Sequence, residues 1–180
     1  MIGFFLKRSI RRFAARYNYD AGHMEHVTNI STSAGLRLSA LQAYSGYSGP
    51  KEARDVWAGA MLASTLEGDC GPCVQLVFDM AIEAQVPADQ LILCLQGMAD
   101  NAGEVGLGFR FARAAIADTS ELDDLRREIQ DRYGASAVIA ASFAASSGRV
   151  YPVLKRGLGF AHTCSNVTFG NEVIRVAHQT

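Results

Sequence analysis

The sequence lacks a continuous apolar run of about 18 residues, the length that a membrane-spanning helix needs. It has only 4 prolines beside 17 glycines and many alanines, a composition that favours closely packed helices over a β-sandwich. Its formal net charge is −1, so bulk charge gives no reason to expect nucleic acid or a strongly acidic partner. With 180 residues, 49% of them hydrophobic, the chain is long enough for one domain with a substantial core.

The N-terminus does not have the pattern of a secretory signal. Residues 1–6 are apolar and the basic residues follow them, whereas a secretory signal has its charges first and a longer apolar stretch. We therefore expect a cytoplasmic protein. In that reducing compartment, 4 cysteines favour catalytic, redox or metal-binding roles over structural disulfides.

Helical periodicity runs along nearly the whole sequence and predicts an all-α fold, a single-domain helical bundle. An N-terminal helical extension occupies residues 1–49, the core residues 50–160, and a tail residues 161–180, where we expect irregular structure or a short strand. The glycines between 103 and 108 are expected to permit close helix packing. Helices are expected at residues 2–17, 31–44, 51–66, 70–84, 90–99, 103–117, 120–132, 135–145 and 149–160, with a short helical piece ending at 27.

The first of these helices is amphipathic and basic. An apolar stripe lies opposite five basic residues, and the first 17 residues contain no acidic one. Such a helix can rest on an anionic membrane surface. We expect instead that the stripe packs on the domain or on a neighbouring subunit, without membrane contact. The stripe comprises Ile2, Leu6, Ile10, Phe13 and Tyr17, and the basic residues are Lys7, Arg8, Arg11, Arg12 and Arg16.

Two cysteines three residues apart, Cys70 and Cys73, open one of the predicted helices. Residues at i and i+3 share a helix face, so both sulfurs point the same way and can close a small disulfide ring. Pro72 is tolerated only in a first turn, which places Cys70 at or beside the helix cap. Unpaired backbone N–H groups and the helix dipole stabilise a thiolate there, the form that nucleophilic sulfur chemistry needs.

The surroundings of this motif distinguish between two families. Cys-Gly-Pro-Cys is the redox motif of thioredoxins, in which it follows a buried strand. Here residues 55–66 precede it with large apolar residues at helical spacing, which disfavours the thioredoxin fold. A helix ending near Glu67, the CxxC helix, and the turn and helix through residues 85–91 together resemble the AhpD-like family. That family includes carboxymuconolactone decarboxylases and alkylhydroperoxidases, and the resemblance covers residues 50–160.

The resemblance implies a homo-oligomeric, all-helical protein whose cysteine pair cycles between dithiol and disulfide without a cofactor. In the peroxidase members the second cysteine, here Cys73, attacks the hydroperoxide, and the first, here Cys70, resolves the sulfenic acid as a disulfide. A dithiol partner such as a lipoyl group then reduces the pair. The position at the helix end instead favours Cys70 as the attacking thiol. Disulfide exchange is the other reaction open to such a pair.

Two positions depart from the pattern of the peroxidase members. Those proteins carry a histidine four residues after the second cysteine, where this chain has Val77, and a glutamate twelve residues before the first, where it has Ala58. Glu67, three residues before Cys70, is the best replacement as general base, since a desolvated carboxylate can take a thiol proton through a water. Asp69 is expected to cap the helix.

Other interpretations stay open beside the redox one. The cysteines can be small buried residues, or His162 and Cys164 can join them in a Cys₃His zinc site. The chain can also be a helical scaffold that has lost catalysis and acts through its oligomer surfaces. Cys94 is expected in the core, and His23 and His26 at the surface or in loop packing, so no metal site is our main expectation.

Overall fold

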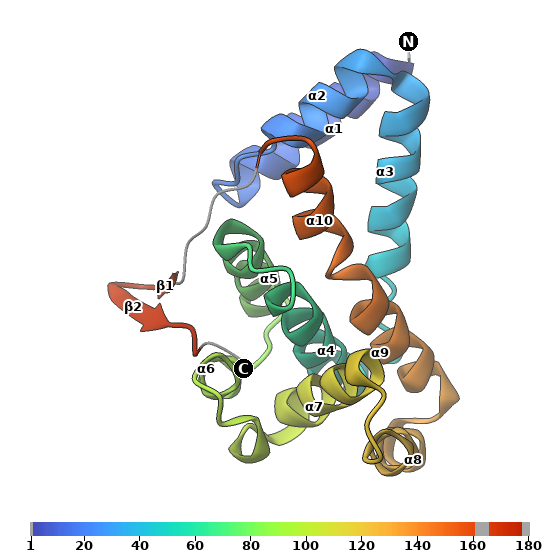
Figure 1. Cartoon of the computed structure of the whole chain (residues 1–180), viewed down its shortest axis with the longest axis vertical. Coiled ribbons are helices and arrows are strands. Elements are labelled where there is room, and N and C mark those ends of the chain that lie inside the picture. The colour runs from blue at the N-terminus through green and yellow to red at the C-terminus, as the bar shows by residue number, and fades with distance from the viewer. Residues whose placement is uncertain (1, 161–165, 178–180) are drawn as a thin grey trace.

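The protein, described here by a computed structural model over residues 2–160 and 166–177, is all-α and built around one central helix (Figure 1). That helix, α4 (Arg54–Leu66), packs against α5 (Gly71–Glu83), α7 (Gly103–Ala117) and α9 (Ala135–Ser147). Most of its 13 residues are buried, because helices surround it on several sides. The predicted all-α, single-domain fold is therefore confirmed.

Glycines let α4 and α7 approach until their backbones touch. A Cβ atom at Gly59 would lie 1.9 Å from the carbonyl oxygen of Val105, and one at Gly108 would lie 1.8 Å from that of Val56. Real Cβ atoms do not come that close to backbone, so only glycine fits at these two positions. The expectation that the glycines of this region permit close helix packing is confirmed.

Shorter elements complete the body of the fold. The 3-10 helix η1 (Lys51–Ala53) leads into α4, and η2 (Ala99–Asn101) connects α6 (Ala88–Leu95) to α7. Helix α8 (Leu122–Tyr133) packs against α7 and α9. It places Leu125 and Ile129 on the core and its charged residues in solvent, as an amphipathic surface helix does.

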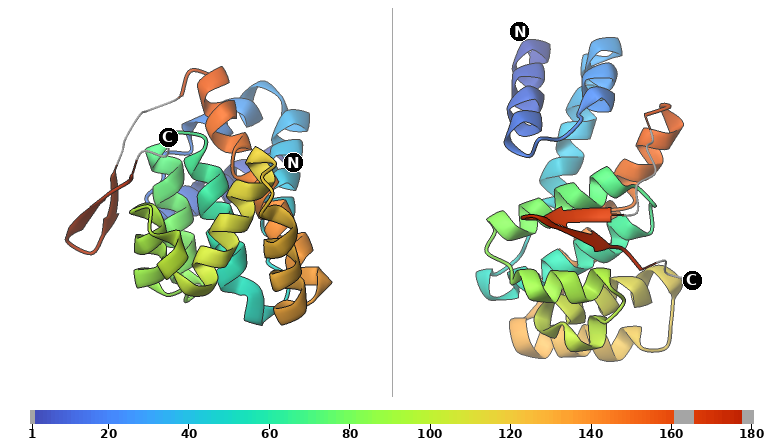
Figure 2. Two further views of the ribbon diagram at one scale, coloured as in Figure 1. Left: turned by 60° about the horizontal axis from the view of Figure 1, so that its bottom comes forward. Right: turned by 90° about the vertical axis from the view of Figure 1, so that its left-hand side faces the viewer.

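The N-terminal helices stand beside this body, and α10 reaches towards them (Figure 2). They are α1 (Ile2–Arg16), α2 (Gly22–Ile30) and α3 (Thr32–Ser45), and α10 spans Val150–Gly157. The side chain of Ser31 caps α3 by accepting a hydrogen bond from the backbone N–H of Ala34 at 3.2 Å.

A small second cluster of buried residues, formed by Tyr19, Ala21 and Met24, joins the N-terminal helices to the body. Three residues of the predicted apolar stripe on α1 pack on this cluster, as does Leu76 of α5, whereas the first residue of the stripe, Ile2, is 59% exposed. The stripe residues that pack are Ile10, Phe13 and Tyr17.

Two short strands occupy the segment that the sequence assigned to the tail. Strands β1 (Asn166–Phe169) and β2 (Glu172–Arg175) form an antiparallel hairpin in which Val167 pairs with Ile174. Both of these side chains are buried in the main core. The side chain of Gln75 fixes β1 to α5, since it hydrogen-bonds the backbone N–H and C=O of Thr168 at 2.6 and 3.0 Å.

One helix of the described residues, Ala135–Gly157, is long and apolar enough to cross a membrane by length and composition alone. This segment comprises α9 and α10 together. Helix α9 packs against α3, α4, α7 and α8 in the body of the fold. A buried core helix meets the same criterion, and the inward face of α9 consists largely of buried alanines, whereas Ile139 is exposed.

Candidate redox site

The two cysteines of the CxxC motif lie at the start of α5 and are joined by a disulfide, with their Cα atoms 5.3 Å apart. Cys70 is the N-cap residue, with an extended backbone, and Pro72 follows in the first turn, as predicted. The expectation that Asp69 caps the helix is wrong. Asp69 lies outside the helix in the left-handed region, at φ 47°, where aspartate is one of the few tolerated residues.

Helix α10 covers the loop that carries the cysteines. Gly68 lies so close to Pro152 that a Cβ atom would approach its ring to 2.3 Å, and Arg156 donates a hydrogen bond to the carbonyl oxygen of Gly68. Where α9 passes into α10, a Cβ atom at Gly148 would lie 2.1 Å from the hydroxyl of Ser64 on α4. The cysteine loop is thus held between α4 and α10.

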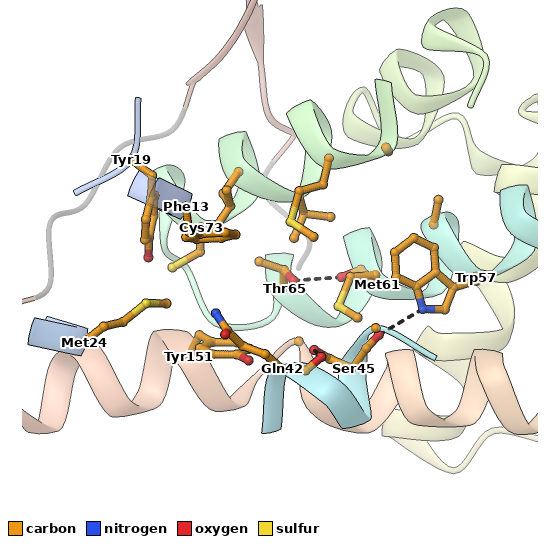
Figure 3. Close-up of a pocket in the computed structure, with 17 residues that line it drawn as sticks. Phe13, Tyr19, Met24, Gln42, Ser45, Trp57, Met61, Thr65, Cys73 and Tyr151 are labelled. Atoms are coloured by element: carbon orange, nitrogen blue, oxygen red, sulfur yellow. Dashed lines mark hydrogen bonds between the residues drawn. The ribbon is translucent and has the colours of Figure 1, made fainter. Parts of the chain in front are cut away.

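A cavity of about 260 Å³ is lined on one side by Cys73 (Figure 3). Cys70 is buried but is not among the described residues that line the cavity. The wall of the cavity consists mostly of aliphatic, aromatic and methionine side chains from α1 to α5 and α10. The lining residues are Phe13, Tyr19, Met24, Gln42, Ser45, Gly46, Trp57, Ala58, Met61, Thr65, Cys73, Leu76, Val77, Met80, Ala81, Gly148 and Tyr151.

Few polar groups line this cavity, and some of them already form hydrogen bonds within the protein. The hydroxyl of Thr65 donates to the carbonyl oxygen of Met61 at 2.8 Å, and Trp57 donates its indole N–H to the backbone of Ser45 at 3.1 Å. The hydroxyl of Tyr151 is buried and has no hydrogen-bond partner of normal geometry among the described residues. Burial raises the pKa of Tyr151, so the phenol stays protonated near neutral pH.

Both positions at which the chain departs from the peroxidase pattern lie in the cavity wall. Ala58 comes from α4 and Val77 from α5, and each lines the same space as Cys73. No carboxylate, histidine or lysine is among the described lining residues. Glu67, the predicted general base, is exposed at the C-cap of α4, outside the cavity lining. Its role stays a prediction.

Three buried polar side chains form a cluster behind the part of the cavity wall that Tyr19 provides. Tyr19 lines the cavity, and the ammonium of Lys155 on α10 lies 3.4 Å from its hydroxyl and 5.0 Å from its ring centre. The ring of His23 meets Tyr19 edge to face at 6.1 Å. Lys155 and His23 are each 1% exposed. Both ring nitrogens of His23 lack a hydrogen-bond partner among the described residues.

Burial sets the protonation of this cluster. It raises the pKa of Tyr19 well above the usual range for a phenol and lowers the pKa of Lys155. Burial, reinforced by the charge of Lys155, lowers the pKa of His23 to about 4, against a small opposing effect of Asp20. At neutral pH the imidazole is therefore uncharged, and among the described residues the amino group of Lys155 is the basic group in contact with the hydroxyl of Tyr19.

The remaining candidate residues do not join the site. Cys94 is fully buried in the core, as expected, and burial raises the pKa of its thiol to about 12. His26 is exposed on α2, as expected. His162 and Cys164, the proposed extra zinc ligands, lie outside the described residues. Within residues 2–160 and 166–177, no group of three or more histidine, cysteine or acidic side chains is placed to hold a metal ion.

Sequence reasoning missed the cluster behind the cavity. His23, expected at the surface or in a loop, is buried in the first turn of α2. Tyr19 lies between two helices, where no periodicity marks it as buried. Lys155 carries the one available signal, because it lies four residues after Tyr151 and three after Pro152, on the inward face of its helix.

Comparisons of the chain with family models, curated proteins and solved structures find no match in any of the three.

Proposed function

We propose that this protein is a thiol–disulfide oxidoreductase that uses Cys73 to attack an apolar hydroperoxide or disulfide entering the cavity. The observation that carries the proposal is the placement of Cys73, which faces an apolar cavity on one side and is bonded to Cys70 on the other. Such a cavity desolvates a bound apolar molecule next to one sulfur, while the second sulfur is already in bonding distance.

The chemistry balances with the two cysteines alone. The thiolate of Cys73 attacks the terminal oxygen of ROOH, the O–O bond breaks, and RO⁻ leaves and takes up a proton as ROH. Cys73 is then a sulfenic acid. The thiol of Cys70 displaces its oxygen as water, which gives the disulfide present in the structure. A dithiol of the lipoyl type, which is oxidised to its own disulfide, returns the pair to two thiols.

The cavity favours Cys73 over Cys70 as the attacking thiol. The helix N-terminus lies nearer to Cys70, and on dipole grounds alone Cys70 would be the more acidic thiol. A substrate must nevertheless touch the sulfur, and of the two only Cys73 lines the cavity. We assign attack to Cys73 and resolution to Cys70, in a cytoplasmic homo-oligomer that a dithiol partner reduces.

Two other functions remain as alternatives. Ala58 and Val77, apolar where peroxidases of the AhpD-like family carry their proton relay, favour a scaffold that has lost catalysis. A zinc site needs two ligands beyond Cys70 and Cys73, and the candidates for it are His162 and Cys164.

Thiol counting after mild oxidation tests the proposal. The reduced protein is treated with cumene hydroperoxide, and free thiols are counted over time in the wild type, Cys70→Ser and Cys73→Ser. We expect the wild type to lose two thiols together and Cys73→Ser to lose none quickly. Cys94, buried in the core, serves as an internal control that stays reduced. Thiol loss no faster than that of free cysteine refutes the proposed function, and bound zinc in the freshly purified protein favours the metal site.

A further inference from the structure

The oxygen that leaves in this reaction needs a proton, and the cavity offers few sources. Among the described lining residues the ionisable groups are Cys73 itself, Tyr19 and Tyr151. The carboxylate of Glu67 is exposed and does not line the cavity. Among the described lining residues, the proton donor other than Cys73 is therefore one of these two phenols.

Tyr19 is the phenol that the fold holds in a fixed position in the same cavity wall as Cys73. In Figure 3 its hydroxyl and the sulfur of Cys73 both point into the cavity, towards Met24. Its backbone N–H donates to the carbonyl oxygen of Ala14 at 2.9 Å, and its ring packs edge to face on Phe13 at 6.1 Å. Only 8% of the residue is exposed. These contacts leave the ring little freedom to turn away.

Lys155 orients the hydroxyl hydrogen of Tyr19. An ammonium has only donors, so across the 3.4 Å contact the phenol oxygen accepts a hydrogen bond from Lys155. The hydrogen of the phenol must then point elsewhere, and the open direction is the cavity. The positive charge also stabilises the phenolate that forms when this hydrogen leaves. Tyr151 has no such cation on its hydroxyl in the described residues.

We propose that Tyr19, with its hydroxyl oriented by Lys155, donates the proton to the oxygen that leaves when Cys73 attacks a hydroperoxide. The step rests on the proposed function. The S–O bond forms, the O–O bond breaks, and RO⁻ takes the phenol proton to become ROH. The phenolate of Tyr19, which the ammonium of Lys155 stabilises, takes a proton from water once ROH has left the cavity, and hydroxide is released. Tyr19 is the catalytic acid and Lys155 a positioning residue.

This role requires the ammonium form of Lys155, which burial disfavours and the neighbouring Asp20 favours. His23 is uncharged at neutral pH, Asp20 provides a carboxylate that favours the ammonium, and Tyr19 stays protonated because of its burial. Burial lowers the pKa of Lys155. When the pH rises through this lowered pKa, Lys155 loses its charge and no longer orients the hydroxyl of Tyr19. The rate constant should therefore rise as Cys73 ionises and fall again as Lys155 loses its proton.

Two reactions of the same thiol separate proton donation from a general effect on Cys73. Reduced wild type and Tyr19→Phe are each treated with cumene hydroperoxide and, separately, with iodoacetamide, whose leaving iodide needs no proton. We expect Tyr19→Phe to lower the rate constant with the hydroperoxide by about 100-fold, as loss of a general acid does, and to leave alkylation unchanged. Tyr17→Phe, which removes a phenol outside the cavity on the same segment, should change neither rate.

Lys155 is tested through the pH profile. Lys155→Met should lower the hydroperoxide rate and abolish its fall at high pH, whereas Lys155→Arg, which keeps a cation that stays charged, should restore the rate and also lack that fall. Melting temperatures show that each variant is folded.

The outcomes are distinct. A wild-type Cys73 no more reactive than free cysteine refutes the proposed function. A reactive wild type with an equally fast Tyr19→Phe, or with both reactions slowed alike, refutes the role of Tyr19 and leaves the proposed function standing. A Tyr19→Phe variant that reacts more slowly with the hydroperoxide but equally fast with iodoacetamide supports the role of Tyr19 as proton donor.

Discussion

Acid should destabilise this protein through His23. The imidazole is 1% exposed, neither nitrogen has a hydrogen-bond partner in the described residues, and its pKa falls from 6.5 to about 4 on folding. Between these two pKa values the unfolded chain binds a proton at His23 that the folded chain does not. Stability is therefore intact above pH 6.5 and is lost as the pH falls towards 4.

The size of the loss follows from the two pKa values of His23. Each pH unit between them costs about 1.4 kcal/mol, so between pH 7 and pH 4.5 the imidazole alone removes about 2.5 kcal/mol of the free energy of unfolding. His23→Leu removes the titrating group and its two unpartnered nitrogens while keeping a similar volume. The difference in the free energy of unfolding between His23→Leu and the wild type should therefore grow by this amount, in favour of the variant, as the pH falls from 7 to 4.5. This holds whatever the difference is at pH 7.

Urea unfolding at pH 7, 5.5 and 4.5 measures the effect. The carboxylates titrate in both proteins, so the difference between wild type and His23→Leu isolates His23. His26→Gln is the matched control, because that side chain is exposed, and it should follow the wild type at every pH. A difference between wild type and His23→Leu that is the same at pH 7 and pH 4.5 would show that His23 is not held neutral by burial.

Three further predictions concern packing and the redox cycle. Gly108→Ala should lower the free energy of unfolding by about 3 kcal/mol, since its Cβ would enter the α4 backbone; an unchanged melting temperature would contradict this. Glu67→Gln should slow disulfide formation by Cys70 without slowing attack by Cys73, because Glu67 lies three residues before Cys70 and outside the cavity; stopped-flow with a sulfenic acid probe separates the steps. Val77→His, which returns an imidazole to the cavity wall, should raise the rate constant with cumene hydroperoxide about tenfold, and a slower folded variant would refute that reasoning.

The helices and the position of the cysteines were predictable because their signals are local. Apolar spacing marks each helix within its own residues, and Pro72 fixes the first turn of α5 by its missing N–H. The hairpin in the last segment was only partly expected. Its stability comes from burying Val167 and Ile174 in a core formed by distant helices, which no local pattern reveals.

The site itself depends on contacts between distant parts of the chain. Lys155 contacts Tyr19 although the two residues are 136 positions apart in the sequence. The residues around each of them carry no pattern that predicts this contact. The sequence showed that Val77 and Ala58 cannot relay protons. Which ionisable groups border the same space as Cys73 depends on how α1, α4, α5 and α10 pack together, and only the fold determines that.

Trapping of the sulfenic acid tests the central claim, attack by Cys73 from the cavity, most directly. Reduced Cys70→Ser is treated with cumene hydroperoxide in the presence of dimedone, and the labelled residue is identified by peptide mass spectrometry, with Cys73→Ser treated in parallel. The proposed mechanism predicts a dimedone adduct on Cys73 in the first variant and none on Cys70 in the second. An adduct on Cys70 alone, or none on either cysteine, would contradict it.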